Sequence, residues 1–401
     1  MQTIGITAEY NPFHKGHAYQ INRIHDLHPD APIIAVMSGS VVQRGQLAFF
    51  DKWQRTKLAL LGGVDLVLEL PAVYSLQSAQ NFAKGAVETL MATGLVDTLS
   101  FGCETDDQSL LLAMAQEGIP SREWQQALDS GLSYAAAARV LYGQRNSAYL
   151  NLLDGSNNLL ALEYIKAAKQ YKNLALLPIR RQGSNYNEDD LVDDLPSGIA
   201  LRKGLAQHSY TTELADGLVA DTKVYVKQYM EKKDVAEEQK RMSLLLTYYL
   251  ENHSLEELAS FSLAAEGEEA LLWKHREVQG LEELASQCAT KRYSPSHLRR
   301  ILLQLMLSTT SCTFQQAAQN APTYIRILGF TAKGRGLAKK MKETATLPVL
   351  TNINKDTLAK APTEAFRDIL TVELRATDLQ ELVMTGKVTH KDYKEKPVIV
   401  V

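Results

Sequence analysis

Two histidines near the N-terminus, His14 and His17, flank Lys15 and Gly16 in the segment AEYNPFHKGH. An imidazole can donate a hydrogen bond to a phosphate oxygen, and removing one such donor from a transition state costs ~2.7 to 4 kcal/mol. The glycine lets a ligand approach the backbone, and the free amides at a helix start form an anion site. The spacing therefore predicts a phosphate site in which both histidines stabilise charge during displacement at phosphorus.

Two simpler roles for the histidine pair stay open, because both side chains could cap the helix that follows or bind a metal ion. A protein-held metal is the weaker option, since no third histidine or carboxylate stands at ligand spacing nearby. The chain also lacks GxGxxG and GxxxxGK[ST], the usual signatures of dinucleotide redox enzymes and Walker-type phosphate sites.

Short apolar runs alternate with amphipathic stretches over the first half of the chain. This alternation predicts an α/β fold, a Rossmann-like open parallel sheet with helical crossovers. The first strand-to-helix turn of such a sheet borders the ligand crevice, and the histidine pair occupies that turn. The expected strands are residues 3–8, 32–37, 65–70, 97–101 and 174–179, and the clearest helices are residues 51–61 and 79–91.

The sequence changes character near residue 205, where we expect a domain boundary. Residues 1–205 should form the domain that carries the phosphate site. Within it, a helical run at 121–142 should cover one side of the site, and the polar, acidic segment 183–197 should form a loop beside it. Beyond residue 206 the strand signal disappears and helical periodicity dominates. Residues 206–401 are therefore expected to form a mostly α-helical domain.

Charge divides this second half unevenly. Residues 213–283 hold 16 acidic and 8 basic residues, whereas residues 291–342 hold 10 basic and no acidic ones. A solvated basic face is the simple explanation of such a window. The complete loss of acids favours a surface for phosphate backbones, where Tyr293, Tyr324 and Phe330 could stack on bases. We therefore expect single-stranded or looped RNA to bind there, although the net charge of the whole chain is only −3.

Three widely spaced cysteines, Cys103, Cys288 and Cys312, form no CxxC or CxxH pair, which argues against a disulfide framework or structural zinc. No apolar stretch approaches the ~18 residues of a membrane span, and the chain begins without a basic and then apolar leader. We expect a cytoplasmic protein without membrane association, and nothing in the sequence implies a protein partner.

Several blocks resemble a known family, in order from residue 3 to about residue 340. HKGH is similar to the motif of the HxGH nucleotidyltransferase superfamily, whose histidines cradle the phosphates of ATP. The further blocks VMSGSVVQRGQLAFFDKWQRTKLAL, GVDLVLELP, FGCE, SNNLLALEY and YIRILGFTAKGR resemble the bacterial tRNA(Met) cytidine acetate ligase family. The resemblance implies that ATP and acetate give acetyladenylate and pyrophosphate. The acetyl group would then pass to the N4 amine of the wobble cytidine of elongator tRNA(Met), giving N4-acetylcytidine.

The resemblance also implies roles for residues of the first domain, with His14 and His17 as the catalytic pair. ATP chemistry implies that Mg²⁺ accompanies the nucleotide, and we expect no metal site formed by the protein itself. Simpler roles stay open for three of the residues named next. Asn157 and Asn158 could cap the helix that they begin, because asparagine is a good N-cap, and Gly102 could form a plain strand-ending turn. The implied ATP-binding residues are Thr7, Ala8, Glu9, Tyr10, Asn11, Pro12, Phe13, His14, Lys15, Gly16, His17, Ala18, Tyr19, Gln20, Gly102, Asn157, Asn158, Arg181, Ser197 and Arg202.

A second group is implied to contact substrate or tRNA, whose wobble base must leave its stack to reach the acyl-adenylate. A tryptophan at helical spacing, such as Trp53, is more often part of the hydrophobic core than a platform on which a base stacks. Asn187 and Ile199 depart from the family pattern, which leaves the contacts near them open. The implied contacts are Gln43, Arg44, Arg55, Lys57, Lys291, Arg292, Arg299, Arg300, Arg326, Lys333 and Arg335.

Three other functions use parts of the same pattern. A cofactor-pathway adenylyltransferase acting on a small phosphorylated substrate would share the HxGH chemistry but would not need a basic second half. A non-catalytic RNA-binding protein could keep a degenerate nucleotide fold, although it would not need an intact histidine pair. A relative of the aminoacyl-tRNA synthetases should carry a KMSKS-type loop, which AKKMKETAT echoes only in composition.

Overall fold

A computed structural model describes residues 2–182, 196–208, 210–261, 267–308 and 313–401. Its centre is one sheet, and the five predicted strands all form parallel members of it, which confirms the predicted α/β class. Most of segment 183–197, including Asn187, lies outside the described residues. The five strands are β1 (Ile4–Ala8), β2 (Ile33–Ser38), β5 (Leu66–Leu70), β6 (Thr98–Cys103) and β7 (Ala175–Arg180).

The strand order is β10-β8-β5-β2-β1-β6-β7, and β9 pairs with β8. Strand β1 lies between β2 and β6, with Ile4 in register with Ile33 on one side and Thr98 on the other. The chain builds outward from β1 through β2 to β5 and then returns to place β6 on the opposite side. The order therefore reverses beside β1, and ligands of open α/β sheets bind at such a reversal.

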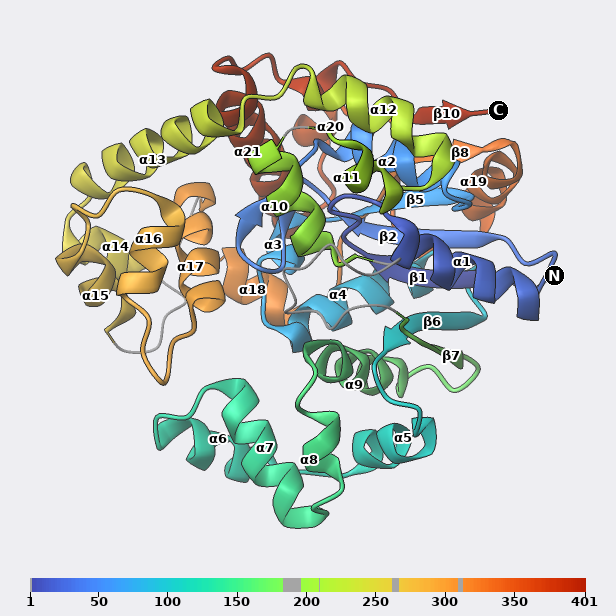
Figure 1. Cartoon of the computed structure of the whole chain (residues 1–401), viewed down its shortest axis with the longest axis horizontal. Helices are drawn as coiled ribbons and strands as arrows, with labels where there is room; N and C mark the ends of the chain where they lie inside the picture. The colour runs from blue at the N-terminus through green and yellow to red at the C-terminus, as the bar shows by residue number, and fades with distance from the viewer. Residues whose placement is uncertain (1, 183–195, 209, 262–266, 309–312) are drawn as a thin grey trace.

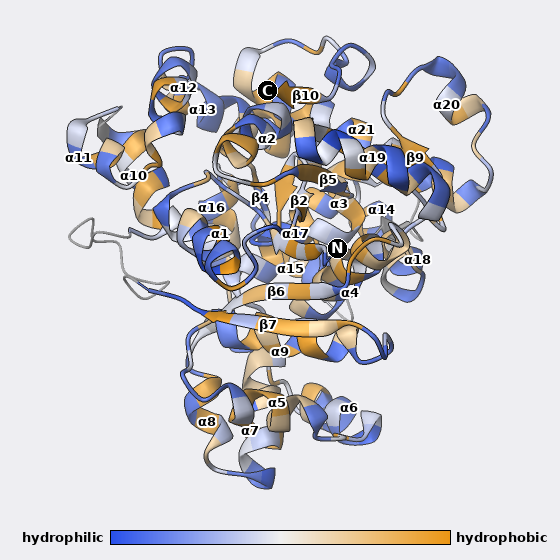
Figure 2. Cartoon of the chain, turned by 90° about the vertical axis from the view of Figure 1, so that its right-hand side faces the viewer, coloured by the Kyte–Doolittle hydropathy of each residue, from blue (hydrophilic) through white to orange (hydrophobic). Residues whose placement is uncertain are grey.

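Alternate residues of the central strands enter two separate cores. Ile34 and Val36 of β2 pack with α4 (Ala79–Ala92) and α9 (Ser156–Ala168) on one face. Ile33 and Ala35 pack with α1 (Lys15–Leu27) and α2 (Lys52–Leu61) on the other. Burial on both faces explains the nearly continuous apolar runs of these strands, and Figure 2 shows hydrophobic residues along β6 and β7.

Two helical lobes project from this sheet layer, as Figure 1 shows. The lobe inserted between β6 and β7 contains the predicted run 121–142 as two helices, because the chain turns at Gly131 with φ +89°. A second lobe has its own apolar core, which includes Leu246, Leu284 and Leu302. The first lobe comprises α5 (Gln108–Gln116), α6 (Ser121–Asp129), α7 (Tyr134–Arg145) and α8 (Tyr149–Leu152). The second comprises α13 (Val235–Glu251), α14 (Leu255–Phe261), α15 (Glu268–Lys274), α16 (Leu281–Gln287) and α17 (Pro295–Leu307).

The remaining elements are short connections and helices on the sheet layer. They are β3 (Val41–Val42), β4 (Gln46–Leu47), α3 (Ala72–Ser75), α10 (Gly198–His208), α11 (Thr212–Asp216), α12 (Ala220–Met230), α18 (Thr313–Gln319), α19 (Ala332–Thr344), α20 (Lys355–Ala359), α21 (Glu364–Thr385) and η1 (Lys391–Tyr393). In the part of the chain that is described, no helix is both long and apolar enough to cross a membrane.

The second half of the chain is mostly helical, but it also supplies three strands to the central sheet. They are β8 (Ile325–Thr331), β9 (Val349–Leu350) and β10 (Val398–Val400). Strand β8 runs antiparallel to β5. The expectation that strands end near residue 206 is therefore wrong, because the buried charge of Arg326 interrupts the apolar run of β8 and hides it from a hydrophobicity pattern.

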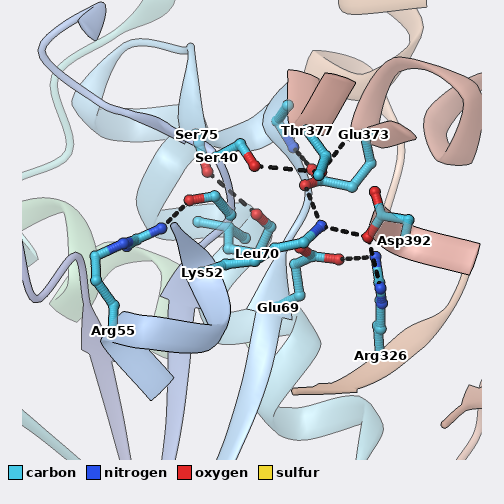
Figure 3. A network of polar contacts seen from close by, with 12 residues as sticks. Ser40, Lys52, Arg55, Glu69, Leu70, Ser75, Arg326, Glu373, Thr377 and Asp392 are labelled. Carbon is cyan, nitrogen blue, oxygen red and sulfur yellow. Dashed lines mark hydrogen bonds and ion pairs between the residues drawn. The ribbon is translucent and has the colours of Figure 1, made fainter. Parts of the chain in front are cut away.

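Arg326 belongs to a buried ion cluster with Lys52, Glu69, Glu373 and Asp392 (Figure 3). Lys52 Nζ lies 2.6 Å from Glu69 Oε1 and 2.8 Å from Asp392 Oδ1. The Arg326 guanidinium lies 2.7 Å from Asp392 and 3.0 Å from Glu69. The cluster therefore joins α2 and β5 to β8, α21 and η1, which are distant in the sequence.

Candidate active site

A cavity of about 290 Å³, here called the edge cavity, opens at the carboxyl ends of β1 and β6, where the strand order reverses. It brings together residues of both predicted groups with an apolar wall whose residues were not among the predicted site residues. Its lining comprises Thr7, Ala8, Glu9, Tyr10, His17, Gln20, Gln43, Arg44, Ala79, Phe82, Phe101, Gly102, Asn157, Leu159, Leu160, Tyr164 and Arg181.

The histidine pair does cap the helix that follows it. Nδ1 of His14 accepts a hydrogen bond from Gly16 N–H at 3.0 Å, and Nδ1 of His17 accepts one from His14 N–H at 3.3 Å. Because each Nδ1 is an acceptor, a neutral ring carries its proton on Nε2. Capping and phosphate binding are therefore compatible, since capping uses only Nδ1 of each ring. His17 lines the edge cavity, whereas His14 lies behind it at 3% exposure.

Both imidazoles are neutral in the free protein. Burial lowers the pKa of His14 to about 3, and the charges of Arg181 and Arg202 act in the same direction. Burial also lowers the pKa of His17 well below its usual value, followed by the effect of His14, whose ring centre is 3.9 Å away. Positive charge at the site therefore comes from arginines, while the histidines supply directed hydrogen-bond donors.

Residues 11–14 form the turn from β1 into α1. They do not occur among the described residues that line the edge cavity, and neighbouring segments hold them behind it. Asn11 Oδ1 accepts a hydrogen bond from Phe49 N–H at 2.7 Å, and Arg202 donates to Asn11 O at 2.5 Å. Pro12 and Phe13 are buried there. Ser197 caps α10 by accepting a hydrogen bond from Ala200 N–H. Four further predicted ATP-binding residues lie in the first turns of α1, namely Lys15, Gly16, Ala18 and Tyr19.

The opposite wall contains Gly102 and Asn157. A Cβ atom on Gly102 would lie 3.2 Å from Arg181 Cγ, so a larger side chain would press on that arginine. Asn157 lines the cavity and accepts a hydrogen bond from Arg181 at 3.4 Å. Asn158 is instead buried and accepts from Glu104 N–H at 2.7 Å, which ties α9 to the end of β6. Of the two predicted asparagines, only Asn157 therefore lines the edge cavity.

Gln43 and Arg44 reach the edge cavity on the turn between β3 and β4. Gln43 N–H donates to Glu9 Oε1 at 2.6 Å, while burial raises the pKa of Glu9. From α17, Arg299 donates to Arg44 O at 3.1 Å and Arg300 donates to Gln43 O at 3.2 Å. The second helical lobe thus holds a turn of the catalytic layer.

Three predicted tRNA contacts need correction because their guanidinium groups are engaged inside the protein. Arg55 is fully buried and donates to Phe50 O at 3.0 Å and Glu9 O at 2.7 Å. Arg326 is held in the buried ion cluster. Arg299 is 8% exposed and pairs with Glu282 at 2.8 Å. An RNA phosphate cannot reach a buried, satisfied guanidinium without displacing these partners.

The acid-free window 291–342 does not form one surface. Lys291 is exposed before α17, and Arg292 lies 5.4 Å from the Tyr293 ring centre. Lys333 and Arg335 are exposed on α19, which follows β8 beside Asp65 at the amino end of β5. That edge is opposite the edge cavity, because β5 and β8 are antiparallel.

Aromatic stacking partners also differ from the prediction. Tyr324 is buried at 1% exposure and packs edge-on against Phe366, so it cannot receive a base. Lys57 lies 3.7 Å from the Tyr225 ring centre on α12, half-buried. The predicted site residues did not include Phe101 and Tyr164 of the edge cavity, although Phe101 is the first residue of FGCE and Tyr164 is the last residue of SNNLLALEY.

Comparison with known proteins matches residues 1–396 to the HIGH Nucleotidyl Transferase family. The tRNA(Met) cytidine acetate ligase of Thermoanaerobacter sp. (strain X514) is 35% identical over 392 residues, 95% of each chain. That of Clostridium kluyveri (strain NBRC 12016) is 33% identical over 424 residues, covering 100% of this chain and 99% of the relative.

Solved structures agree with these matches. Thermotoga maritima TmcAL in its apo form I has a TM-score of 0.91 and 28% identity, with 100% of both chains covered. The same protein bound with alpha-thio ATP has a TM-score of 0.89 and 27% identity over 100% of both chains. The chain, with its HKGH turn at the edge cavity, therefore belongs to the tRNA(Met) cytidine acetate ligase family of HIGH nucleotidyl transferases.

Proposed function

We propose that this protein is an ATP-dependent ligase that activates acetate and transfers the acetyl group to the N4 amine of the wobble cytidine of elongator tRNA(Met). The observation that carries the proposal is the gathering of His17, Arg44 and Arg181 around the edge cavity. Donors and positive charge there suit a triphosphate, while Phe101 and Tyr164 offer an apolar wall for a nucleobase.

In the first step, an acetate oxygen attacks the α-phosphorus of ATP, and the bond to the bridging oxygen of the β-phosphate breaks. Pyrophosphate leaves with the bonding electron pair, and acetyladenylate remains. The Nε2–H groups of His14 and His17 donate to phosphate oxygens as negative charge grows on them. Arg44 and Arg181 supply the positive charge that the neutral imidazoles lack.

In the second step, the cytidine N4 attacks the acetyl carbonyl carbon. The carbon–oxygen bond to the phosphate breaks, AMP leaves, and the amine nitrogen loses a proton. The cytidine must be unstacked to reach a cavity at the sheet edge, as for other enzymes that modify bases. We place this chemistry in the cytoplasm, where tRNA and ATP are both present.

Mg²⁺ enters this scheme as part of the MgATP substrate. Within the described residues, no group of three or more His, Cys, Asp or Glu side chains could hold a metal ion. Phosphate oxygens and water would therefore supply most of its ligands, which is the usual arrangement for Mg²⁺ at nucleotide sites.

The test is pyrophosphate exchange into ATP with a series of small carboxylates, followed by transfer of labelled acetate to tRNA(Met). We expect exchange that depends on a carboxylate and is strongest with acetate, and label at the wobble cytidine. Exchange that depends on a small phosphorylated substrate instead would identify a cofactor-pathway adenylyltransferase. Absence of exchange with every carboxylate, despite RNA binding, would identify a non-catalytic RNA-binding protein.

A further inference from the structure

A second polar cleft, of about 310 Å³, adjoins the edge cavity. We call it the amide cleft, after the amide side chains of Gln77, Asn81, Gln304 and Gln315 in its lining. The two spaces share a wall, because Gln43 of the edge cavity donates to Gln77 O at 3.4 Å. At the start of α4, Ser78 lines the cleft and the next residue, Ala79, lines the cavity. The two spaces are therefore neighbours, so consecutive nucleotides of one strand could occupy them.

One face of α17 borders the amide cleft. His297, Arg300 and Gln304 occur at intervals of three and four residues, the spacing that places side chains along one helix face. Leu298, Leu302 and Leu305 point instead into the apolar core of the second lobe. The polar face of α17 is therefore turned toward the catalytic layer.

Arg300 is the charged group of the cleft. Its Nη1 donates to Gln43 O at 3.2 Å, and no ion pair joins it to a carboxylate among the described residues. The buried Glu268, which lies 2.7 Å from His297 of the cleft, acts on Arg300 by charge alone. Its neighbour Arg299 is paired with Glu282. Burial, followed by the charge of Arg299, lowers the pKa of Arg300 to about 10, although it stays a cation at neutral pH. A guanidinium has five N–H donors, so most of its hydrogen-bonding capacity is left for an anion.

Gln304 is a second side chain of the cleft whose hydrogen-bonding capacity is only partly used. Its Nε2 donates to Leu76 O at 2.5 Å, while its Oε1 is buried and has no hydrogen-bond partner in the described part of the chain. The residue as a whole is 6% exposed. Side-chain amides carry both a donor and an acceptor, which is what recognition of nucleobase edges requires. A cation and several amides in one cleft suit a nucleotide better than an apolar ligand.

We propose that the amide cleft binds one phosphodiester-linked nucleotide of the acceptor RNA, adjacent to the cytidine that reaches the edge cavity. Arg300 donates to its phosphate, and Asn81, Gln304 and Gln315 contact its base. The proposal rests on the proposed function, since it requires an RNA acceptor. It also gives Arg300 a defined role next to the active site, in place of a general contact on a basic surface.

The first test is Asn81→Asp with Gln80→Glu as its matched control. Asn81 is the third residue of α4, where a carboxylate is favourable at a helix start, and the change gives up only a 3.4 Å hydrogen bond to Gln77. Gln80 precedes it and lines a different groove, beside Trp124. Both changes add one negative charge, but only the first adds it to the amide cleft.

We expect Asn81→Asp to raise the KM for tRNA(Met) by about tenfold, because a carboxylate in the cleft repels the RNA phosphate and competes with it for the Arg300 guanidinium. Acetate-dependent exchange without tRNA should stay within about twofold of wild type, and Gln80→Glu should leave both assays within that range. An equal rise in KM for both variants would contradict the proposal, because the effect would then be general repulsion. A higher KM for pyrophosphate in Asn81→Asp would overturn it in favour of a pyrophosphate site.

The second test is Arg300→Gln. The slope of log KM for tRNA against log salt should fall by about 0.7, the value for one contact to single-stranded phosphate. An unchanged slope together with lost exchange would overturn the proposal and make Arg300 only a support for the Gln43 turn. If wild-type protein transfers no acetate, the proposed function itself fails. If wild type transfers acetate and Asn81→Asp does so equally well, only the amide cleft proposal fails.

Discussion

Removing Lys52 from the buried ion cluster should destabilise the protein far more than neutralising Glu373 there. Two cations, Lys52 and Arg326, face the carboxyl groups of Glu69, Glu373 and Asp392. Burial, followed by the neighbouring charge of Glu69, raises the pKa of Glu373 to about 8. Glu373 therefore keeps its proton at pH 7, and the other four groups balance to zero.

Lys52→Met leaves the two remaining carboxylates of this cluster facing one guanidinium, away from water. Breaking a buried ion pair on one side costs about 3 to 5 kcal/mol. Glu373→Gln, in contrast, keeps the shape of a protonated carboxyl. Its amide oxygen can accept from Ala72 N–H, which donates to Glu373 Oε2 at 2.6 Å in the wild type. Its NH₂ replaces Oε1 and can donate to Glu69, at the loss of only the long 3.3 Å bond from Lys52. We expect it to cost less than ~1 kcal/mol at pH 7.

The pH dependence gives this prediction a second readout. Because the folded pKa of Glu373 lies above the ordinary value of 4.5, the folded state holds a proton that the unfolded state releases. The stability from this group is present below about pH 4.5 and is lost as pH rises toward about 8, by ~1.4 kcal/mol per pH unit. Between about pH 6 and 7.5, wild type should lose ~2 kcal/mol that Glu373→Gln does not lose.

Urea unfolding followed by circular dichroism measures both effects. The free energy of unfolding of each variant is compared with wild type at about pH 6 and pH 7.5, which bracket most of the expected change. The reasoning is refuted if Glu373→Gln costs as much as Lys52→Met at pH 7, because Glu373 would then be ionised. A cost below ~1 kcal/mol for Lys52→Met would equally refute the uncompensated-charge argument.

Three further predictions concern the edge cavity. His17→Ala should lower the kcat of acetate-dependent exchange by ~100- to 1000-fold, as loss of one phosphate donor does, and no change in kcat would contradict its catalytic role. Gly102→Val should raise the KM for ATP, because even a Cβ atom there would lie 3.2 Å from Arg181 Cγ; unchanged ATP binding by calorimetry would count against this wall as a nucleotide contact. Since burial lowers the pKa of both His14 and His17, kcat/KM for ATP should have no histidine inflection near pH 6.5, and an inflection there that disappears in His17→Ala would show that the free enzyme carries a charged imidazole.

Local pattern was sufficient to predict the parallel strands and the place of the HKGH turn at the sheet edge. The apolar runs of β2 and β5 are buried along their whole length, so hydrophobicity and structure coincide there. The HKGH turn lies at the carboxyl edge of β1, as its place after the first strand predicts. Strand β8 was missed because Arg326 is buried inside it, and only Glu69 and Asp392, far away in sequence, make that burial tolerable.

The sequence by itself determined the α/β class and the place of the histidine pair at the carboxyl edge of the sheet, because strand burial and helix starts depend on neighbouring residues. Tertiary structure decided which arginines can meet a ligand. Arg55 and Arg326 are inside the protein, while Arg300 borders the amide cleft and Arg335 lies on the opposite edge of the sheet. Composition treats these residues alike, but the partners that bury or expose a guanidinium come from distant segments, and only the folded chain brings them together.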